Sequence, residues 1–159
     1  MPEKSNAAPY LFGDLLALAR QSWVRQMEGR LDRLGFADYR RSDAATLRLL
    51  QRAPVPIGRL GIALGVTRQA ARKVADGLGE RDYARTERDA RDSRKLNIVL
   101  TTRGELYAGA VVEVIEALNA ELRDRVDLSQ LKAADAVLRA AIADDEAARR
   151  IATLVRAPG

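Results

Sequence analysis

Cysteine and histidine are absent from this chain of 159 residues. Without cysteine, the chain can form no disulfide, thiolate metal site, cysteine nucleophile or cysteine redox sensor. Without histidine, it cannot build a Ser-His-Asp triad, and a zinc or non-haem iron site would depend on carboxylates alone. These two absences remove much of common enzyme chemistry, and we expect neither a metal nor a cofactor.

Long apolar runs are absent as well. No segment approaches the ~18 consecutive apolar residues of a membrane span. Residues 1–9, with Glu3 beside Lys4, lack the apolar stretch of a secretory signal and look like a flexible tail. The sequence therefore predicts a cytoplasmic protein that has no contact with a membrane.

Charged residues are plentiful and unevenly placed. They make up 31% of the chain beside 47% hydrophobic residues, which suits one domain of roughly 100–200 residues. The net charge is +5, and residues 51–100 carry 11 basic against 6 acidic side chains. A basic middle third favours a surface that faces a polyanion, and a solvated arginine-rich surface is the alternative.

Paired carboxylates occur at Asp144-Asp145 and at Glu113 and Glu116, and general acid–base chemistry uses such pairs. They lie in charged helical segments, without a glycine-rich loop or a partner nucleophile. A solvated helix face explains them better, so we expect no enzymatic activity.

Helical periodicity dominates both ends of the chain. Two adjacent apolar rows predict a long helix over residues 10–34 that buries more than one face. Ser42 is a good cap for a short helix over residues 43–52. A second long helix is predicted from the Thr101 cap to about residue 125, with helical spacing again beyond residue 128.

Two shorter helices are predicted in the middle third, over residues 57–64 and 68–81, with Gly65 as the stop signal and Thr67 as the N-cap. Helices of this length separated by a three-residue turn are typical of a helix-turn-helix. Gly77 lies late in the second helix, where glycine costs roughly 1 kcal/mol relative to alanine. The outward side of that helix carries Arg68, Gln69, Arg72 and Lys73.

The periodicity changes after residue 82. Residues 83–87 are predicted to form a strand, residues 88–94 a charged turn, and residues 96–100 a second, half-buried strand. Residues 53–56 allow at most a short extended piece. The sequence thus predicts a mainly α fold with a small β-hairpin wing, in which a winged helix-turn-helix lies between long terminal helices.

Several motifs lie between Leu60 and Gly104. The Leu64-Gly65-Val66 turn leads into Thr67-Arg68-Gln69-Ala70-Ala71, and Asp89, Asp92 and Arg94 form the pattern D-x-x-D-x-R. Leu100-Thr101-Thr102-Arg103-Gly104 then gives L-T-x-x-G. Together these motifs resemble those of the multiple-antibiotic-resistance regulator (MarR) family of bacterial transcription factors.

The resemblance implies a sequence-specific transcriptional regulator, a ligand-responsive repressor that binds a palindromic operator as a homodimer. The terminal helices are too apolar for one small lobe to cover, so we expect them to pack against a second subunit. The expected organisation is a tail (1–9), an N-terminal dimerisation helix and loop (10–41), a DNA-binding lobe (42–102) and C-terminal dimerisation helices (103–159). A winged-helix module that binds a protein partner, with weak or no affinity for DNA, is the alternative.

The residues expected to contact double-stranded DNA lie on the recognition helix, on the wing and before the helix at residues 43–52. Arginine can bind guanine O6 and N7, glutamine can pair with adenine N6 and N7, and a narrow minor groove attracts arginine. These residues are Thr67, Arg68, Gln69, Arg72, Lys73, Arg91, Arg94 and Arg41. The resemblance implies that Asp89 and Asp92 hold the wing arginines in a salt-bridge network. A solvated charged surface is the alternative for all of these residues.

The family has a small-molecule cleft between its dimerisation helices and its DNA-binding lobe. The resemblance therefore implies Trp23, Tyr39 and Tyr107 as residues that could line such a cleft here. The matching effector would be a small aromatic or lipophilic molecule. Core packing is the alternative for each of the three.

Overall fold

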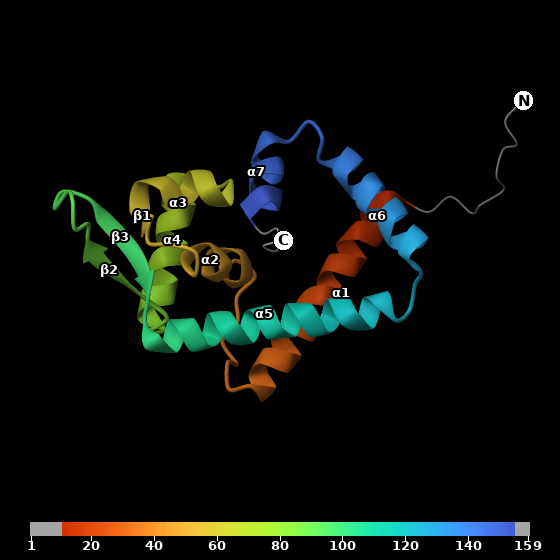
Figure 1. Cartoon of the computed structure of the whole chain (residues 1–159), viewed down its shortest axis with the longest axis horizontal. Coiled ribbons are helices and arrows are strands. Elements are labelled where there is room, and N and C mark those ends of the chain that lie inside the picture. Colours follow the sequence, from red (N-terminus) through yellow and green to blue (C-terminus); the bar gives the residue numbers. More distant parts are fainter. Residues whose placement is uncertain (1–10, 155–159) are drawn as a thin grey trace, which may run out of the picture.

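The computed structural model describes residues 11–154 and folds them into seven helices and a small antiparallel sheet (Figure 1). The helices are α1 (Phe12–Arg33), α2 (Asp43–Leu50), α3 (Ile57–Leu64), α4 (Arg68–Glu80), α5 (Thr102–Arg123), α6 (Leu128–Ala141) and α7 (Glu146–Leu154). The strands are β1 (Val55–Pro56), β2 (Ala84–Arg88) and β3 (Leu96–Leu100). The predicted mainly helical fold with a β-hairpin is confirmed, whereas the predicted tail lies outside the described residues.

The sheet ties the hairpin of β2 and β3 to the start of the helix-turn-helix. Its strand order is β1-β3-β2, and both pairings are antiparallel. Ala84 pairs with Leu100 at the base, and Arg88 pairs with Leu96 towards the tip. Ile98 and Leu100 are buried, while Leu96 is 45% exposed. The hairpin is therefore anchored at its base and projects away from the helices as a wing (Figure 1).

The core lies where α2, α3, α4 and the sheet meet the C-terminal half of α1 and the first part of α5. Each of the first four helices contributes a leucine that is at most 1% exposed. These leucines are Leu31, Leu47, Leu60 and Leu78. Burying a leucine contributes about 1.5–3 kcal/mol, so this shared core holds the lobe together.

The L-T-x-x-G motif joins the wing to α5. The Thr101 hydroxyl accepts a hydrogen bond from the Gly104 amide at 3.0 Å and donates one to the Asp82 carbonyl at 2.6 Å. A Cβ atom on Gly104 would lie only 1.8 Å from the carbonyl oxygen of Tyr83. The threonine of the motif therefore caps α5, and its glycine allows the backbone at Tyr83 to pack directly against that helix.

One predicted helix cap is wrong. The side chain of Ser42 makes no capping hydrogen bond, and α2 ends at Leu50 rather than at residue 52. Instead, the Asp43 carboxylate accepts a hydrogen bond from the Arg40 amide at 2.9 Å. This carboxylate is buried and binds the segment before the helix, so it does not take over the role of a cap at the first turn of α2.

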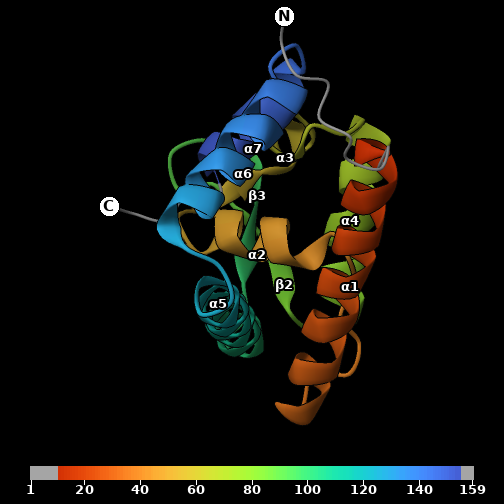
Figure 2. The ribbon, with the colours of Figure 1, turned by 90° about the vertical axis from the view of Figure 1, so that its right-hand side faces the viewer.

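The terminal helices extend beyond the lobe. Figure 1 shows α1 crossing α5, and Figure 2 shows α5 nearly end-on beside the lower part of α1. Where the two helices meet, Arg30 donates to both carboxylate oxygens of Glu121 at 2.8 and 2.7 Å. A break after α6 makes α7 a separate helix, which returns to α3. There, a Cβ atom on Gly65 would lie 3.0 Å from Cδ1 of Ile151. Among the helices formed by residues 11–154, none combines the length and apolar character needed to cross a membrane.

Candidate nucleic-acid interface

The helix-turn-helix begins its second helix at a well-formed cap. Gly65 ends α3 with φ at 66°, in the left-handed region that glycine tolerates best. The Thr67 hydroxyl then accepts a hydrogen bond from the Ala70 amide at 3.1 Å, which confirms Thr67 as the predicted N-cap of α4. The cap uses the threonine side chain within the protein, so a contact between Thr67 and DNA stays a prediction.

The outward face of α4 carries the four predicted polar and basic side chains. All of them are exposed: Arg68, Gln69, Arg72 and Lys73. Arg72 lies 3.7 Å from Asp76, and the side chains are 65% and 58% exposed, so this ion pair is weak and readily exchanged. Within residues 11–154 the other three side chains form no ion pair or hydrogen bond. The face is therefore available to a partner.

The predicted salt-bridge network of the wing is wrong for Asp89. Its carboxylate accepts hydrogen bonds from the Arg91 amide at 2.9 Å, the Asp92 amide at 3.1 Å and Nδ2 of Asn97 at 2.8 Å. The bond from Asn97 and the two backbone bonds hold the pKa of Asp89 below its ordinary value. A short side chain that accepts from the amide two residues on is an Asx-turn, so Asp89 shapes the wing tip rather than neutralising an arginine.

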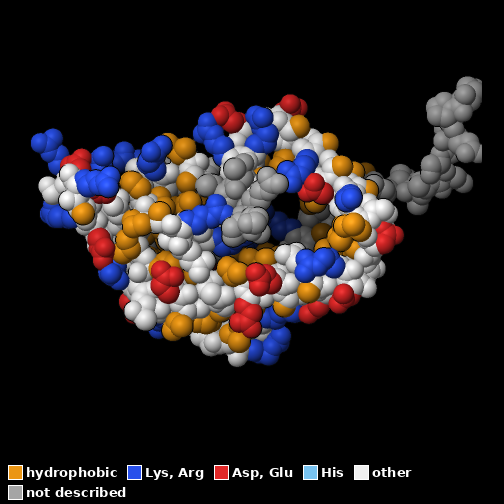
Figure 3. All heavy atoms as spheres, in the orientation of Figure 1, with side chains coloured by type: hydrophobic (Ala, Val, Ile, Leu, Met, Phe, Trp, Pro, Cys, Tyr) orange, Lys and Arg blue, Asp and Glu red, His pale blue; other side chains and the backbone are white. Residues whose placement is uncertain are grey.

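Asp92 has a similar role. It accepts a hydrogen bond from the Arg94 amide at 3.1 Å, and its charge partner is Lys95 at 3.6 Å rather than an arginine. Among the described residues, no ion pair engages the side chains of Arg91 and Arg94, and both are exposed. The two aspartates thus fix the backbone of the tip and leave both guanidinium groups free. Figure 3 shows Lys and Arg side chains gathered at the end of the molecule that carries the wing.

The segment before α2 contains two neighbouring arginines. Arg41 is exposed, and its contact with DNA stays a prediction. The guanidinium of Arg40 lies over α4, where a Cβ atom on Gly77 would be 2.6 Å from Nη1. Because Nη1 is the end of a flexible side chain, this guanidinium can move aside, and the contact does not by itself require glycine at position 77.

The three predicted ligand-cleft residues differ in how deeply they are buried. Tyr107 is 0% exposed, and its ring centroid lies 4.8 Å from that of Phe36 and 4.3 Å from that of Tyr83. This is a packing position rather than the wall of an open cleft. Trp23 and Tyr39 are partly buried against the core, and a ligand role for them stays a prediction.

A buried polar cluster next to these rings was also missed. The Asp43 carboxylate, 0% exposed, accepts hydrogen bonds from both terminal nitrogens of Arg81 at 2.8 and 3.0 Å. It also accepts one from the Tyr107 hydroxyl at 2.8 Å. Burial, together with the charge of Asp43, raises the pKa of Tyr107, which therefore stays a hydrogen-bond donor. The aspartate at the start of α2 gave no sequence signal of these distant partners.

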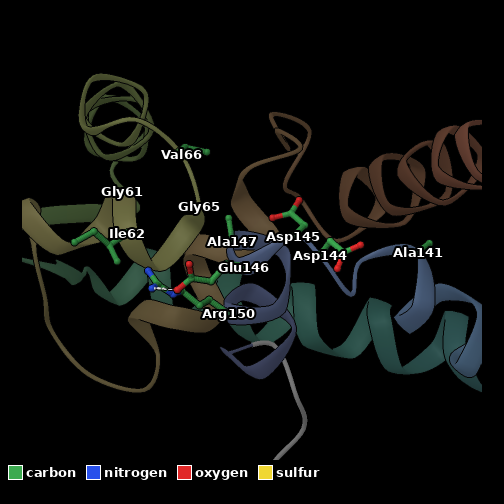
Figure 4. A pocket seen from close by; sticks show the side chains of 10 residues that line it. All are labelled: Gly61, Ile62, Gly65, Val66, Ala141, Asp144, Asp145, Glu146, Ala147 and Arg150. Carbon is green, nitrogen blue, oxygen red and sulfur yellow. Dashed lines mark hydrogen bonds and ion pairs between the residues drawn. The ribbon is translucent and has the colours of Figure 1, made fainter.

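An open groove of about 740 Å³ lies between the turn of the helix-turn-helix and the segment that joins α6 to α7 (Figure 4). Exposed Ile62 and Val66 line one side, and the acidic residues 144–146 line the other. Glu146 pairs with Arg150 one turn further along α7 (Figure 4). None of the predicted DNA or ligand residues lines this groove, and no group of three potential metal ligands occurs in the described part of the chain.

No protein-family model and no curated protein sequence matches this chain. Solved structures do match it. MepR of S. aureus in a complex with DNA superposes with a TM-score of 0.73 at 18% identity, covering 86% of this chain and 99% of that one. A mutant MarR of E. coli complexed with operator DNA gives 0.67 at 19% identity, covering 82% and 92%. A probable transcriptional regulator of Pseudomonas aeruginosa gives 0.66 at 20% identity, covering 83% and 97%.

These likenesses define the fold in two steps. The helix-turn-helix of α3 and α4 with the wing of β2 and β3 makes this a winged helix-turn-helix protein. The long helices around that lobe are arranged as in MarR and MepR, so the chain has the fold of the MarR family, as its motifs predicted.

Proposed function

We propose that this protein is a DNA-binding transcriptional regulator that acts as a homodimer. The observation that carries the proposal is the basic surface formed by the exposed face of α4 together with Arg91 and Arg94 of the wing. A recognition helix of this kind enters a major groove, and the wing then meets the adjacent backbone or minor groove. The solved structures of MepR with DNA and MarR with operator DNA have the same fold.

Exposed apolar side chains support the homodimer. Leu11, at the N-cap of α1, is 69% exposed, Leu18 of α1 is 59% exposed and Leu128 of α6 is 66% exposed. Large apolar side chains that are left exposed on neighbouring helices often mark a protein–protein contact. Because the helices that carry them are those beyond the lobe, a second copy of the chain would cover them without blocking α4 or the wing.

The finer features of the proposal follow from this symmetry. A two-fold dimer presents two identical recognition helices, so its operator is palindromic, with half-sites about 34 Å apart. Such a dimer represses transcription when its operator overlaps a promoter. We propose that a small aromatic or lipophilic effector binds near Trp23 of α1 and Tyr39 of the segment before α2, which are partly buried against the core, and releases the DNA.

A selection experiment tests the proposal. Purified protein would be mixed with random duplexes, and the enriched duplex would be titrated at several salt concentrations beside a scrambled one. We expect a palindromic consensus, a dimer in sedimentation, and an affinity that falls linearly with salt on a logarithmic scale. Binding without enrichment would contradict sequence recognition. An absence of salt-dependent duplex binding would instead favour the module that binds a protein partner.

A further inference from the structure

The buried carboxylate of Asp43 connects three elements that are far apart in the sequence. It lies in the first turn of α2 and accepts a bidentate pair of hydrogen bonds from Arg81 at the end of α4. A third hydrogen bond comes from the Tyr107 hydroxyl of α5. The Arg40 amide supplies the fourth. Three of these four donors are bound to Oδ2 and one to Oδ1, so both oxygens of the carboxylate are engaged.

Arg81 attaches this carboxylate to the recognition helix. It is the first residue after α4, and its Nε donates to the Gly77 carbonyl in the last turn of that helix at 2.7 Å. Its Nη1 also donates to the Asp38 carbonyl, in the segment before α2, at 2.8 Å. The guanidinium therefore links the C-terminal end of α4 to the segment that leads to α2 by hydrogen bonds.

The energetics of a buried ion pair favour a role in orienting the two helices over a role in stabilising the fold. Burying two charges carries a desolvation cost, and well-packed apolar side chains of similar volume often give equal or greater stability. A planar, bidentate arginine–carboxylate pair does fix the orientation of its two side chains relative to each other. The side chain of Arg81 is 10% exposed and that of Asp43 is 0% exposed, so water does not loosen this orientation.

The position of the pair at one end of α4 makes that orientation matter. A helix of 13 residues is about 20 Å long, so a tilt of about 10° at its C-terminal end moves its N-terminal end by about 3 Å. Arg68 and Gln69 lie at that N-terminal end. A displacement of that size breaks a base-edge hydrogen bond, whereas the attraction between a basic surface and phosphates tolerates it.

We propose that Asp43 is a positioning residue that holds the recognition helix α4 at a fixed angle to α5 and thereby sets the specificity of DNA binding. The inference rests on the proposed function for its effect on DNA. The fixed angle between α4 and α5 is a property of the free protein and is testable without DNA. Tyr107 supplies the link to α5, and Arg81 supplies the link to α4.

The first test compares two variants, each of which removes the carboxylate charge from a bidentate arginine–carboxylate pair. Asp43→Asn alters the pair at the end of α4, and Glu121→Gln alters the matched pair between α1 and α5. We expect Asp43→Asn to weaken binding to the selected duplex at least about 10-fold while changing binding to a scrambled duplex less than about 2-fold. Glu121→Gln should leave the ratio of the two affinities unchanged.

A milder variant guards against simple unfolding. Tyr107→Phe removes only the hydroxyl that links Asp43 to α5 and keeps the ring in the aromatic stack. It should lower the specificity ratio about 3-fold, with thermal unfolding checked in the same samples. An equal loss of affinity for both duplexes, or a loss that follows the unfolded fraction, would overturn the proposal.

The second test measures the angle directly. Because the chain contains no cysteine, Lys73→Cys on α4 and Glu113→Cys on α5 allow a pair of spin labels to be attached without background. Labelled chains diluted with unlabelled ones should give a narrow distance distribution, which Asp43→Asn broadens or shifts and Glu121→Gln does not. An unchanged distribution would overturn the inference even if the protein binds DNA. A broadened one would support the fixed angle even if the proposed function failed.

Discussion

The winged lobe and the terminal helices differ sharply in how they bury apolar side chains. In the lobe, Leu47 and Leu78 are 0% exposed, and the aromatic ring of Tyr83 is packed with no exposed surface. In the first part of α1 every residue from 11 to 21 is exposed, and α6 has no buried residue at all. The lobe is thus packed within one chain, together with the inner parts of α1 and α5, whereas the start of α1 and all of α6 are left uncovered.

This difference separates two tasks. A lobe with its own core can keep the shape of its DNA-facing surface, while helices with exposed leucines can stabilise an assembly only when a second surface covers them. We infer that folding of the lobe depends little on protein concentration, and that ordering of the terminal helices depends on it strongly. Changes in the two regions should therefore have different signatures.

The largest effect is expected for the terminal helices. Leu15 and Leu18 are 50% and 59% exposed and lie three residues apart on one face of α1. Changing both to Glu should weaken dimerisation by about 3–6 kcal/mol, because each leucine loses the benefit of burial. Sedimentation equilibrium would measure this.

Leu96→Glu, at a 45% exposed leucine on the wing, is the matched control and should leave the dimer intact. A wild-type protein that is monomeric at micromolar concentration would contradict the comparison between the two regions.

A single glycine should give the next largest effect, on the lobe. A Cβ atom on Gly104 would meet the Tyr83 carbonyl oxygen at 1.8 Å, so Gly104→Ala forces backbone to move and should lower the free energy of unfolding by about 3 kcal/mol. Gly109 lies on the same helix with nothing within 4 Å, so Gly109→Ala should be neutral or stabilising by up to about 1 kcal/mol. Urea denaturation of both variants measures the difference, and equal effects would show that the contact is unimportant.

Features fixed by a few neighbouring residues were predictable from the sequence. Thr67 and Thr101 cap helices as predicted, because each accepts a hydrogen bond from an amide only three residues on. The stop at Gly65 is equally local. The order of helices and strands followed from such signals together with apolar periodicity, and the exposed face of α4 followed from helical spacing.

Features that depend on distant residues were not predictable. Asp43 pairs with a residue 38 positions away, and nothing near it in the sequence marks this partner. The approach of the Arg40 guanidinium to Gly77 is likewise a contact between residues that are distant in the sequence. For Asp89 the resemblance implied a salt bridge to the wing arginines, whereas its carboxylate accepts hydrogen bonds from two backbone amides of the turn and from Asn97. The pattern of charged residues in the sequence shows where ionised groups lie along the chain, but it does not show which donors form hydrogen bonds with them.

Within the lobe, α4 and the wing should differ in what they contribute to DNA binding. Arg72 is exposed on the outward face of α4 and only weakly paired. Arg72→Ala should therefore cost about 1–3 kcal/mol on the selected duplex and much less on a scrambled one. Arg94→Ala should weaken both by a smaller amount and flatten the salt slope by about one unit. An equal loss on both duplexes for Arg72→Ala would make it a phosphate contact.

The smallest effect is expected at the wing tip, as the pH is lowered. The folded pKa of Asp89 lies below its ordinary value of 3.8, because Asn97 and two backbone amides stabilise the charged form. The ionised carboxylate therefore stabilises the turn above pH 3.8, and this contribution is lost as the pH falls through the lower, folded pKa. The amide signals of Arg91 and Asp92 in NMR spectra should report this loss.

The capping aspartate of α6 provides an internal reference for that titration. Asp127 also has a lowered pKa, chiefly because the Ser129 hydroxyl donates to it, and its titration is visible at the Gln130 amide. Asp89→Asn should abolish the transition at the wing amides and leave the one at Gln130 unchanged. A wing transition at pH 3.8 or higher in the wild-type protein would mean that the ionised carboxylate does not stabilise the turn. In that case the wing arginines would owe their placement to the strand pairing of β2 and β3 alone.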